Sequence, residues 1–458
     1  MNTYDITLKK IAHEPKWVAI ALLTGIALFL GAGLYISGIF GIIVALMPLL
    51  LLLAVLCLIN PYPFWLFFFF LAPLSYIVQD IFPTGSFIRF LGLVLVAFSV
   101  PSILMSKRSA NFKMTPLGAS LLLFFLGCSI SLLAFVDLEE SFSGLELFFG
   151  NILSYWVFIN IFKKEKKLES LLNVLIAAVS IQALIAVVQK LIHPLWRSAG
   201  TITDPNYFGF WLLPFICFAF YLGVAERNSL KKVLYFSAYA IMSIAIPLTY
   251  SRSMIIVLVI AQFVLFWRQK KLLLFGVFIL ATGALLVIGF PNLFAQGISI
   301  SSFFTAARVA SIDWRWYFAQ TAVKMFLEHP LFGIGVDAFF STFQFYSATT
   351  PTIRIAVVHD SFLEILSGTG LVGSVPFAFI LFFSVRNFWQ ARKRQKQRMD
   401  KNRRLLAEGL LVGFLISLLS HFFLSTQHHV TLWLFIAFST IVLNQSLSHD
   451  KQNSLQTD

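Results

Sequence analysis

Charged residues are scarce in this 458-residue chain: Asp, Glu, Lys and Arg together make up 12% of it, whereas 59% of the residues are hydrophobic. Apolar runs follow one another along nearly the whole sequence, and no polar stretch is long enough for a soluble domain of ordinary size. The runs are continuous over about 20 residues rather than alternating in strands of about 10, which argues against a transmembrane barrel. The composition therefore predicts an all-α polytopic membrane protein.

Cysteines are also few, and Cys57, Cys128 and Cys217 all lie inside apolar runs. Their spacing supports neither a disulfide framework nor a thiolate metal site. His428 and His429 are of a metal-ligating type, but no carboxylate or thiolate stands at ligand spacing from them. We therefore expect no metal and no cofactor.

The apolar runs predict about 12–14 transmembrane helices, because a span needs about 20 residues. The candidate spans are residues 17–37, 39–59, 63–79, 87–105, 116–135, 147–162, 170–191, 207–225, 233–250, 254–267, 272–290, 361–385, 405–424 and 430–446.

Acidic residues are fewer than basic ones, 20 against 34, which gives a formal net charge of +14. If the N-terminus is cytoplasmic, 26 of the 34 Lys and Arg fall on that side, and the last loop there, 391–404, is almost a continuous basic run. This bias predicts that both termini are cytoplasmic. The basic run is a short hinge between spans, so we assign it to orientation or to lipid headgroups and expect no nucleic-acid partner.

Eight cations break the rule that outer loops avoid Lys and Arg, and most lie near outer span ends or in one long external segment, 291–360. They are Arg89, Lys190, Arg197, Arg252, Arg308, Arg315, Lys324 and Arg354. Any single one is explained by a side chain that snorkels to the interface. Together they indicate an anionic ligand on the outer face, such as a phosphate.

Arg252 interrupts two apolar runs that leave no room for a real loop. A guanidinium costs about 2.5–3.5 kcal/mol at mid-bilayer, so it needs a partner, a watery cavity or an interfacial position. Its fork matches two oxygens of a diphosphate, and the neighbouring Ser251 and Ser253 offer further donors. The alternative is that Arg252 and its serines only cap a tight helical hairpin.

A second outer segment, 191–208, carries strong turn residues. Asp204-Pro205-Asn206 predicts a helix start with Pro near the first position, and this structural role is the favoured one for Asp204 and Asn206. Arg197 has no evident structural duty. Arg197 either lines the same cavity as Arg252 or is an interfacial side chain.

The external segment contains a helical pattern over Ala307–Glu328, in which apolar and aromatic residues are interleaved with charged ones. The pattern is typical of an amphipathic helix that lies on the membrane. Arg308 and Arg315 are seven residues apart and so share one helix face, where they either bind one ligand or face solvent. Gly333 and Gly335 predict a tight chain reversal soon afterwards.

His359 closes the external segment, directly before Asp360 and the sequence Ser361-Phe362-Leu363-Glu364. Ser361 and Glu364 fit a capping box, with Ser at the N-cap and Glu three residues later. The partial positive charge of that helix N-terminus disfavours protonation of His359 and favours the neutral imidazole that a general base needs. His359 is therefore a candidate catalytic base, with an ordinary interfacial histidine as the alternative.

The order of these motifs resembles that of the O-antigen ligase and polymerase superfamily of bacterial membrane proteins. The resemblance covers about 200–373 and rests on Gly200-Thr201, Asp204-Pro205-Asn206, Tyr250-Ser251-Arg252-Ser253, Arg308 with Trp314-Arg315, Glu328-His329-Pro330-Leu331-Phe332-Gly333-Ile334-Gly335, and His359 through Glu364 with Gly368, Gly370 and Gly373. It implies N-terminal transmembrane helices over 1–199, a catalytic membrane region over 200–446 and a cytoplasmic tail over 447–458.

The resemblance further implies a metal-independent glycosyltransferase of the C-type membrane fold that uses an undecaprenyl-diphosphate-linked glycan on the outer face of the bacterial cytoplasmic membrane. The implied base is His359, and the implied diphosphate ligands are Arg252, Arg197, Arg315 and Arg308. The implied supporting residues are Ser251, Ser253, Asp360 and Glu364. Asp360 stands where the family often has Asn, which leaves its role open.

Two alternatives remain at the level of sequence. The acceptor is a lipid core for an O-antigen ligase or another glycan repeat for a polysaccharide polymerase, and both activities share the donor site. A lipid-linked oligosaccharide flippase or transporter would share the helix number and the cation-lined cavity. It would be expected to have internal repeats and charged residues at mid-membrane depth, and no repeat is obvious here.

Overall fold

The computed structural model describes residues 52–74, 87–105, 115–134, 138–194, 196–202, 204–289, 306–346 and 357–454. These residues are mostly helical and contain no β-strand, which confirms the predicted all-α class. In chain order the helices are α4 (Tyr62–Leu71), η1 (Ala72–Leu74), α6 (Phe87–Met105), α7 (Pro116–Ser131), η2 (Leu132–Ala134), α8 (Leu138–Ile161), α9 (Glu165–Ile192), α10 (Pro205–Ala225), α11 (Ser229–Ala245), η3 (Pro247–Thr249), α12 (Arg252–Arg268), α13 (Leu272–Gly289), α15 (Ala306–Glu328), α16 (Phe339–Tyr346), α17 (Ser361–Gln397), α18 (Lys401–His421) and α19 (Val430–Ser454).

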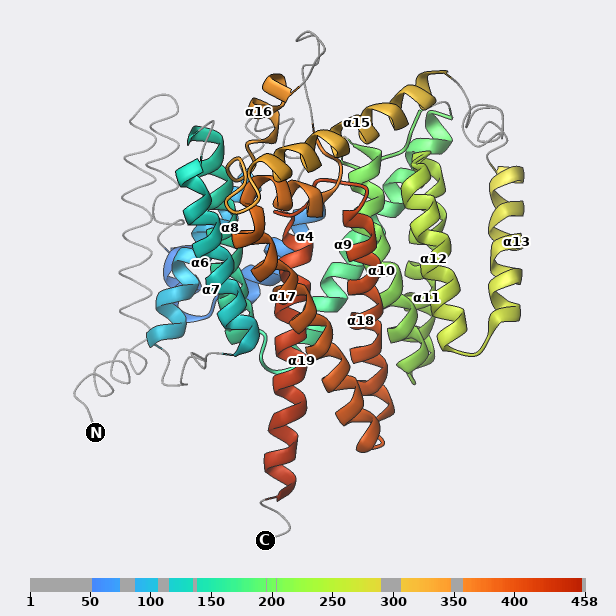
Figure 1. Cartoon of the computed structure of the whole chain (residues 1–458). Helices are drawn as coiled ribbons and strands as arrows, with labels where there is room; N and C mark the ends of the chain where they lie inside the picture. The colour runs from blue at the N-terminus through green and yellow to red at the C-terminus, as the bar shows by residue number, and fades with distance from the viewer. Residues whose placement is uncertain are drawn as a thin grey trace, which may run out of the picture.

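Most of the helices stand side by side in a bundle, whereas α15 lies across one end of it (Figure 1). Seven segments of the described chain are long and apolar enough to cross a membrane: α8, α9, α10, α11 with η3, α17, α18 and α19. Three shorter apolar helices are Phe90–Met105, Pro116–Ser131 and Leu272–Ala284. The fold is therefore that of a polytopic membrane protein, as predicted.

The first predicted span, 17–37, and most of the second, 39–59, lie outside the described residues. The described end of the second, Leu52–Ile59, meets Tyr62–Leu74 at a bend of 111°. These two pieces, predicted to belong to separate spans, pass the span test only as one bent pair. Pro61 stands at the bend, where its missing N–H and fixed φ favour a break in the helix.

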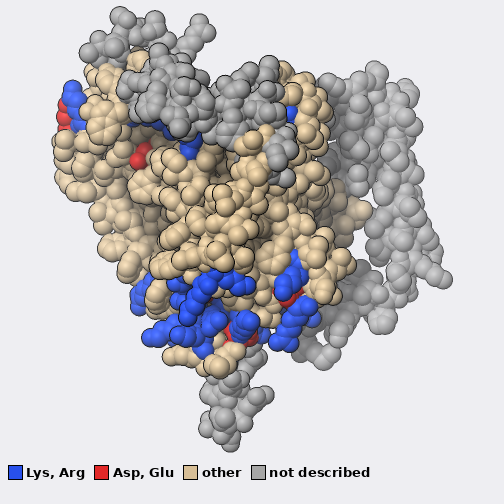
Figure 2. Space-filling view, turned by 90° about the vertical axis from the view of Figure 1, so that its right-hand side faces the viewer, with Lys and Arg blue, Asp and Glu red and all other residues tan. Residues whose placement is uncertain are grey.

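Lys and Arg side chains gather at one end of the bundle, and a broad band without charged side chains separates them from the other end (Figure 2). We call the end that carries Arg268, Arg392 and Arg404 the basic end. The opposite end carries α15 (Figure 1) and the start of α17, which follows His359 and Asp360 directly, and we call it the histidine end. An uncharged belt between two polar ends is the surface expected of a protein that spans a bilayer.

Side-chain caps fix two of the turns at the basic end. The Asn228 side chain accepts a hydrogen bond from the Lys231 N–H (3.0 Å) at the start of α11. Asp400 accepts one from the Arg403 N–H (3.1 Å) at the start of α18. Each cap satisfies a backbone donor that the first helical turn would leave unpaired, and is worth about 1 kcal/mol.

Aromatic packing holds α17 within the bundle. Phe124 of α7 lies 4.8 Å from Phe148 of α8 and 5.3 Å from Phe377 of α17, measured between ring centroids. Trp433 of α19 lies 6.0 Å from Phe148, and its indole N–H donates to the Gln427 carbonyl (3.0 Å). Aromatic pairs of this kind add about 0.5–1.5 kcal/mol each beyond the area that they bury. They anchor the helix whose first residue follows the His359-Asp360 pair.

α17 is broken near its start, at Gly370, whose φ of 57° and ψ of −157° are not helical. The break leaves backbone groups free, and the chain after α15 pairs with them. The N–H groups of Leu371 and Val372 donate to the carbonyls of Pro330 (2.8 Å) and Leu331 (3.1 Å). A helix interrupted at membrane depth is tolerated where protein partners satisfy its backbone in this way.

The predicted chain reversal at Gly333 and Gly335 is confirmed, because both have positive φ, 70° and 109°. The Gly335 N–H donates to the carbonyl of Gly368 (3.0 Å) in the first part of α17. An added Cβ at Gly333 would lie 2.4 Å from that same carbonyl oxygen. Glycine is therefore required here both by conformation and by the close approach of two backbones.

Gly370→Ala is expected to destabilise the protein by about 2 kcal/mol or more, because a Cβ there meets the Leu331 carbonyl oxygen at 2.4 Å and φ lies in the left-handed region. Gly276→Ala in α13 is the matched control, since no atom lies within 4 Å of its Cβ position. The control should be neutral or slightly stabilising. Thermal unfolding in detergent compares the two, and equal midpoints would show that the break in α17 does not require glycine.

Candidate active site

His359 lies at the histidine end, in the short segment that leads into α17. Its backbone φ is 57°, in the left-handed region that few residues other than glycine adopt. The His359 N–H donates to Ser425 Oγ (3.1 Å), which lies in the turn between α18 and α19. Such a conformation persists where the surroundings hold it, and strained residues cluster at functional sites.

The predicted capping box is wrong, because the N-cap of α17 is Asp360 and not Ser361. Asp360 Oδ1 accepts from the N–H groups of Phe362 (2.9 Å) and Leu363 (3.1 Å). Ser361 is buried and bonds across the fold instead: its hydroxyl donates to the Leu424 carbonyl (2.7 Å). Asp and Asn are equally good N-caps, so the Asp at position 360 fills the structural role that Asn would have.

The imidazole of His359 is held neutral. Burial, and after it the positive charge of Arg315, lower its pKa to about 4, whereas the Asp204 carboxylate acts in the opposite direction. Burial is the largest cause of this low pKa, whereas the sequence suggested the helix N-terminus. A neutral imidazole at pH 7 has a free nitrogen lone pair that can accept a proton.

Arg315 projects from α15 and brings three distant parts of the chain together. Burial, and then the charges of Arg252 and Arg197, lower the pKa of its guanidinium, while Asp204 raises it. The helix that lies across the bundle therefore places Arg315 close to both of these arginines and to His359. Three guanidinium groups with one carboxylate among them form a strongly positive site.

Arg252 is the first residue of α12, so it stands at a helix N-terminus directed toward the histidine end. The N-cap residue before it, Ser251, makes no side-chain cap. Its hydroxyl instead donates to Asn206 Oδ1 (2.7 Å) and lies 3.4 Å from the hydroxyl of Ser253. An uncapped helix N-terminus beside an arginine is a favourable place for a phosphate group.

Arg197 has a structural duty that the sequence did not reveal. Its Nε donates to the Thr249 carbonyl (2.8 Å), and its Nη2 lies 3.4 Å from Asn206 Oδ1. The segment before α10 is thereby tied to the turn before α12. Arg197 therefore belongs to the positive cluster and also holds in place the turn that precedes Arg252.

The helix start predicted at Asp204-Pro205-Asn206 is confirmed, with Asp204 as N-cap and its carboxylate accepting from the Asn206 N–H (2.6 Å). The two polar residues do more than start the helix, however. Asn206 joins Ser251 to Arg197, and Asp204 faces both His359 and Arg315 electrostatically. Sequence reasoning favoured turn chemistry for both residues, and the resemblance of the Asp204-Pro205-Asn206 segment to the family pattern was the available signal for more.

Two further predicted residues are Glu364 and Arg308. Glu364 does not complete a capping box; its carboxylate lies beside Asp337, Ser425 and Gln427. Arg308 lies in the first turn of α15, and its side chain is outside the described residues. α15 itself exposes Trp316 and Leu327 while burying other apolar residues, so apolar side chains lie on more than one face of this predicted amphipathic helix.

Lys190 of α9 was found in sequence only as an unusual outer cation, and the structure gives it a precise position. It is fully buried, and its Nζ donates to the Tyr250 hydroxyl (2.6 Å) and to the Trp196 carbonyl (2.8 Å). Tyr250 has a φ of 54° and directly precedes Ser251. Lys190 therefore braces the two segments that carry Arg197 and Arg252.

The histidines near the last hairpin are used in packing and hydrogen bonding. His428 pairs with Asp337, with 2.6 Å between Nε2 and Oδ2, and packs against Phe148 with the rings tilted and their centroids 4.0 Å apart. The charge of His428 lowers the pKa of Asp337 against the effect of burial. The pair ties the segment after α15 to the turn before α19.

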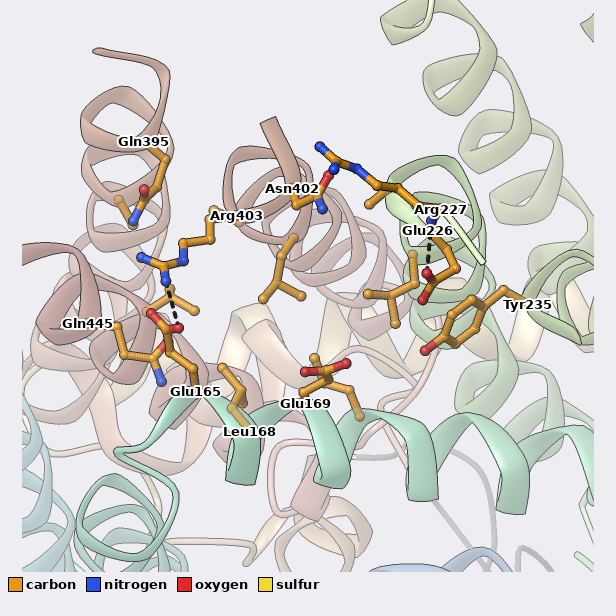
Figure 3. A pocket seen from close by; sticks show the side chains of 17 residues that line it. Glu165, Leu168, Glu169, Glu226, Arg227, Tyr235, Gln395, Asn402, Arg403 and Gln445 are labelled. Carbon is orange, nitrogen blue, oxygen red and sulfur yellow. Dashed lines mark hydrogen bonds and ion pairs between the residues drawn. The ribbon is translucent and has the colours of Figure 1, made fainter. Parts of the chain in front are cut away.

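A separate cavity of about 330 Å³ lies at the basic end, among α9, α10, α11, α17, α18 and α19 (Figure 3). Arg403 and Glu165 pair on its wall at 2.9 Å, and the Glu226 carboxylate accepts from the Arg227 N–H (2.8 Å). Arg197, Arg252, Arg315 and His359 are not among the residues that line it. The positive cluster at the histidine end is therefore the better candidate for the active site.

The fold and this cluster define a class: a polytopic all-α membrane protein with arginines and a neutral histidine gathered at one end of its bundle. Residues 237–378 match the family model described as O-Antigen ligase, in agreement with the resemblance of the motifs, and this match supports membership of the O-antigen ligase superfamily. The matched region includes Arg252, Arg315 and His359. It supports a membrane glycosyltransferase activity of the O-antigen ligase or polymerase type. No curated protein matches the chain.

Proposed function

We propose that this protein transfers a glycan from an undecaprenyl-diphosphate-linked donor to an acceptor hydroxyl, with the positive cluster at the histidine end as its active site. The observation that carries the proposal is the placement of Arg197, Arg252 and Arg315 close to a neutral His359. A cluster that repels its own members is stabilised by an anion, and a diphosphate supplies several anionic oxygens at once. Arg308 on α15 is a further candidate ligand.

In the proposed reaction His359 removes the proton from the acceptor hydroxyl as its oxygen attacks the anomeric carbon of the donor. The bond between that carbon and the diphosphate oxygen breaks, and the diphosphate leaves with the electron pair. The arginines stabilise the charge that develops on the leaving group, which is where fixed cations in a site of low dielectric constant give the largest benefit. Ser251 and Ser253 support the arginines, Asp360 sets the start of α17, and no metal is required in this scheme.

We further propose that the basic end faces the cytoplasm and that the active site opens on the outer face of a bacterial cytoplasmic membrane. The gathering of Lys and Arg at the basic end supports this orientation, because cytoplasmic loops retain positive charge (Figure 2). Both chain termini would then be cytoplasmic. Residues 200–446 form the catalytic membrane region in this proposal, with membrane lipids around it and no nucleic-acid partner.

The acceptor is a lipid core if the protein is a ligase in lipopolysaccharide biosynthesis, and another repeat unit if it is a surface or exopolysaccharide polymerase. Both activities need the same donor site. The glycan pattern of a deletion strain distinguishes them, because loss of attachment to a lipid core and loss of chain length give different ladders on a gel.

Reconstitution in vesicles with a defined lipid-linked donor and an acceptor tests the proposal directly. Transfer releases undecaprenyl diphosphate and extends or attaches the glycan. A flippase would move the donor across the bilayer without releasing the diphosphate, and this result would overturn the proposal. Addition of a chelator should leave transfer unchanged if the arginines alone neutralise the leaving group.

Arg315→Gln is expected to raise the pKa of His359, because it removes a nearby positive charge that disfavours the imidazolium. The acid limb of kcat/KM, which reports the free enzyme, should therefore shift to higher pH than in the unmodified protein, where the pKa is about 4. Lys324→Gln on the same helix is the matched control, since Lys324 is exposed and pairs only weakly with Glu328 at 4.0 Å. If both variants have the same acid limb, the charge of Arg315 does not act on the catalytic base.

A further inference from the structure

A second cavity at the basic end, of about 620 Å³, lies where α12, α13, α17 and α18 meet. Its lining residues lie at the end of the bundle where Figure 2 shows Lys and Arg gathered. The charged residues of its lining are five cations and one carboxylate: Arg268, Lys270, Arg392, Lys396, Arg404 and Glu408. Orientation in the membrane requires positive charge in loops but not its concentration around one hollow.

The single carboxylate of this cavity is fully used by two of the cations. Glu408 is 7% exposed, and its Oε1 lies 2.7 Å from Arg268 Nη2 while its Oε2 lies 3.2 Å from Arg392 Nε. These contacts satisfy a buried carboxylate well. They leave no acidic group in the lining for the other cations.

The remaining cations, Lys270, Lys396 and Arg404, have no carboxylate partner within the described part of the chain. The Nε of Arg404 is moreover buried and makes no hydrogen bond. A buried donor without an acceptor is costly, and in a native protein it calls for a bound ion, water or ligand. The site therefore lacks an acceptor that carries negative charge.

One wall of the cavity is apolar and open to the surroundings of the bundle. Trp267 is 57% exposed and Leu272 is 47% exposed, and both line the cavity next to the cations. Tryptophan is enriched at the level where membrane and water meet. A ligand that fills the cavity thus has a phosphate-like head at the cations and apolar chains along Trp267 and Leu272.

We propose that this cavity binds the phosphodiester headgroup of an anionic diacyl phospholipid. Lys270, Lys396 and Arg404 hold the phosphate oxygens, and the acyl chains lie against Trp267 and Leu272 in the adjacent leaflet. Basic pockets between transmembrane helices are suited to such headgroups. The site is distinct from the glycan donor site at the opposite end and does not depend on the proposed transfer activity.

Native mass spectrometry of the delipidated full-length protein titrated with phosphatidylglycerol tests this proposal. The triple variant Lys270→Gln, Lys396→Gln, Arg404→Gln should bind the lipid about a hundredfold more weakly, since each basic residue contributes about fivefold. The matched control is Lys163→Gln, Lys164→Gln, Lys232→Gln, which removes the same charge from exposed residues outside the cavity. The affinity of this control for the lipid should be unchanged. The lipid should raise the thermal midpoint of the unmodified protein and of the control, but not that of the Lys270→Gln, Lys396→Gln, Arg404→Gln variant.

Three results would overturn the lipid site. If both triple variants bind phosphatidylglycerol equally weakly, binding depends on general surface charge and not on this cavity. Phosphatidylethanolamine with the same acyl chains binding as tightly would show that the anionic head is not recognised. Displacement of the lipid by an equal concentration of inorganic phosphate would define a free-anion site. If the Lys270→Gln, Lys396→Gln, Arg404→Gln variant proves unstable, Lys396→Gln alone is the test. Lys396 is exposed, so this variant should keep its fold, and it should still weaken lipid binding about fivefold.

Discussion

Replacement of His359 by alanine is expected to lower the rate of glycan transfer by about 10²–10⁴-fold, the usual contribution of a general base. The imidazole is neutral at pH 7 because its pKa lies at about 4, so the unmodified enzyme has its base ready without a change of pH. The loss should appear in kcat, since the lost interaction is made with the proton that is transferred in the transition state and not with the bound donor. Transfer from a defined lipid-linked donor in vesicles measures it.

Two controls make this result specific to His359. His359→Gln keeps a side chain of similar reach without a basic nitrogen, and it should be as inactive as His359→Ala. His329→Ala removes an exposed histidine from the same end of the bundle and should retain activity. Near-normal product from His359→Ala in a correctly inserted protein would remove this residue from the mechanism.

The pH dependence gives an independent reading of the same group. The donor diphosphate brings negative charge next to His359, which favours the imidazolium and raises its pKa in the complex. The acid limb of kcat, which reports the complex, should therefore lie at higher pH than that of kcat/KM, which reports the free enzyme. Superimposed limbs would indicate that the diphosphate does not bind beside His359.

Arg252→Ala is expected to lower kcat/KM by about 10²–10³-fold, the cost of removing one fixed donor to the developing charge of a leaving group. Arg252 occupies the first turn of α12, where the helix N-terminus adds to its field. Arg252→Lys should recover only part of the loss, because lysine restores the charge but not the bidentate fork. Arg227→Ala removes an exposed arginine at the basic end and serves as the control.

Membrane insertion and thermal unfolding of these variants must accompany the kinetic measurements. The cluster around Arg315 is self-repelling, so Arg252→Ala relieves charge repulsion in the absence of donor, and its thermal midpoint shows whether the variant keeps its fold. A variant that keeps its fold and loses transfer supports the proposed role. A variant with normal kcat/KM would contradict it.

Several features of the site could not have been read from sequence. Ser361 was a sound N-cap by spacing, yet Asp360 caps α17 because Ser361 is drawn into hydrogen bonds with the turn before α19. Arg197 and Thr249 are distant in sequence and meet only through the packing of α10 against α12. Sequence rules describe neighbours along the chain, and these contacts join residues that only the fold makes neighbours.

The sequence by itself determined the membrane class, the helix over Ala307–Glu328 to within a residue, the start of α10 and the residues that could carry chemistry. Each of these follows from hydropathy, charge or turn chemistry within a short window. Only the tertiary structure decided that Arg197, Arg252, Arg315 and His359 lie close together, and that the chain after α15 completes the backbone of the broken α17. Burial is a property of the packed chain, which is why the neutral state of His359 emerges at that level and not before.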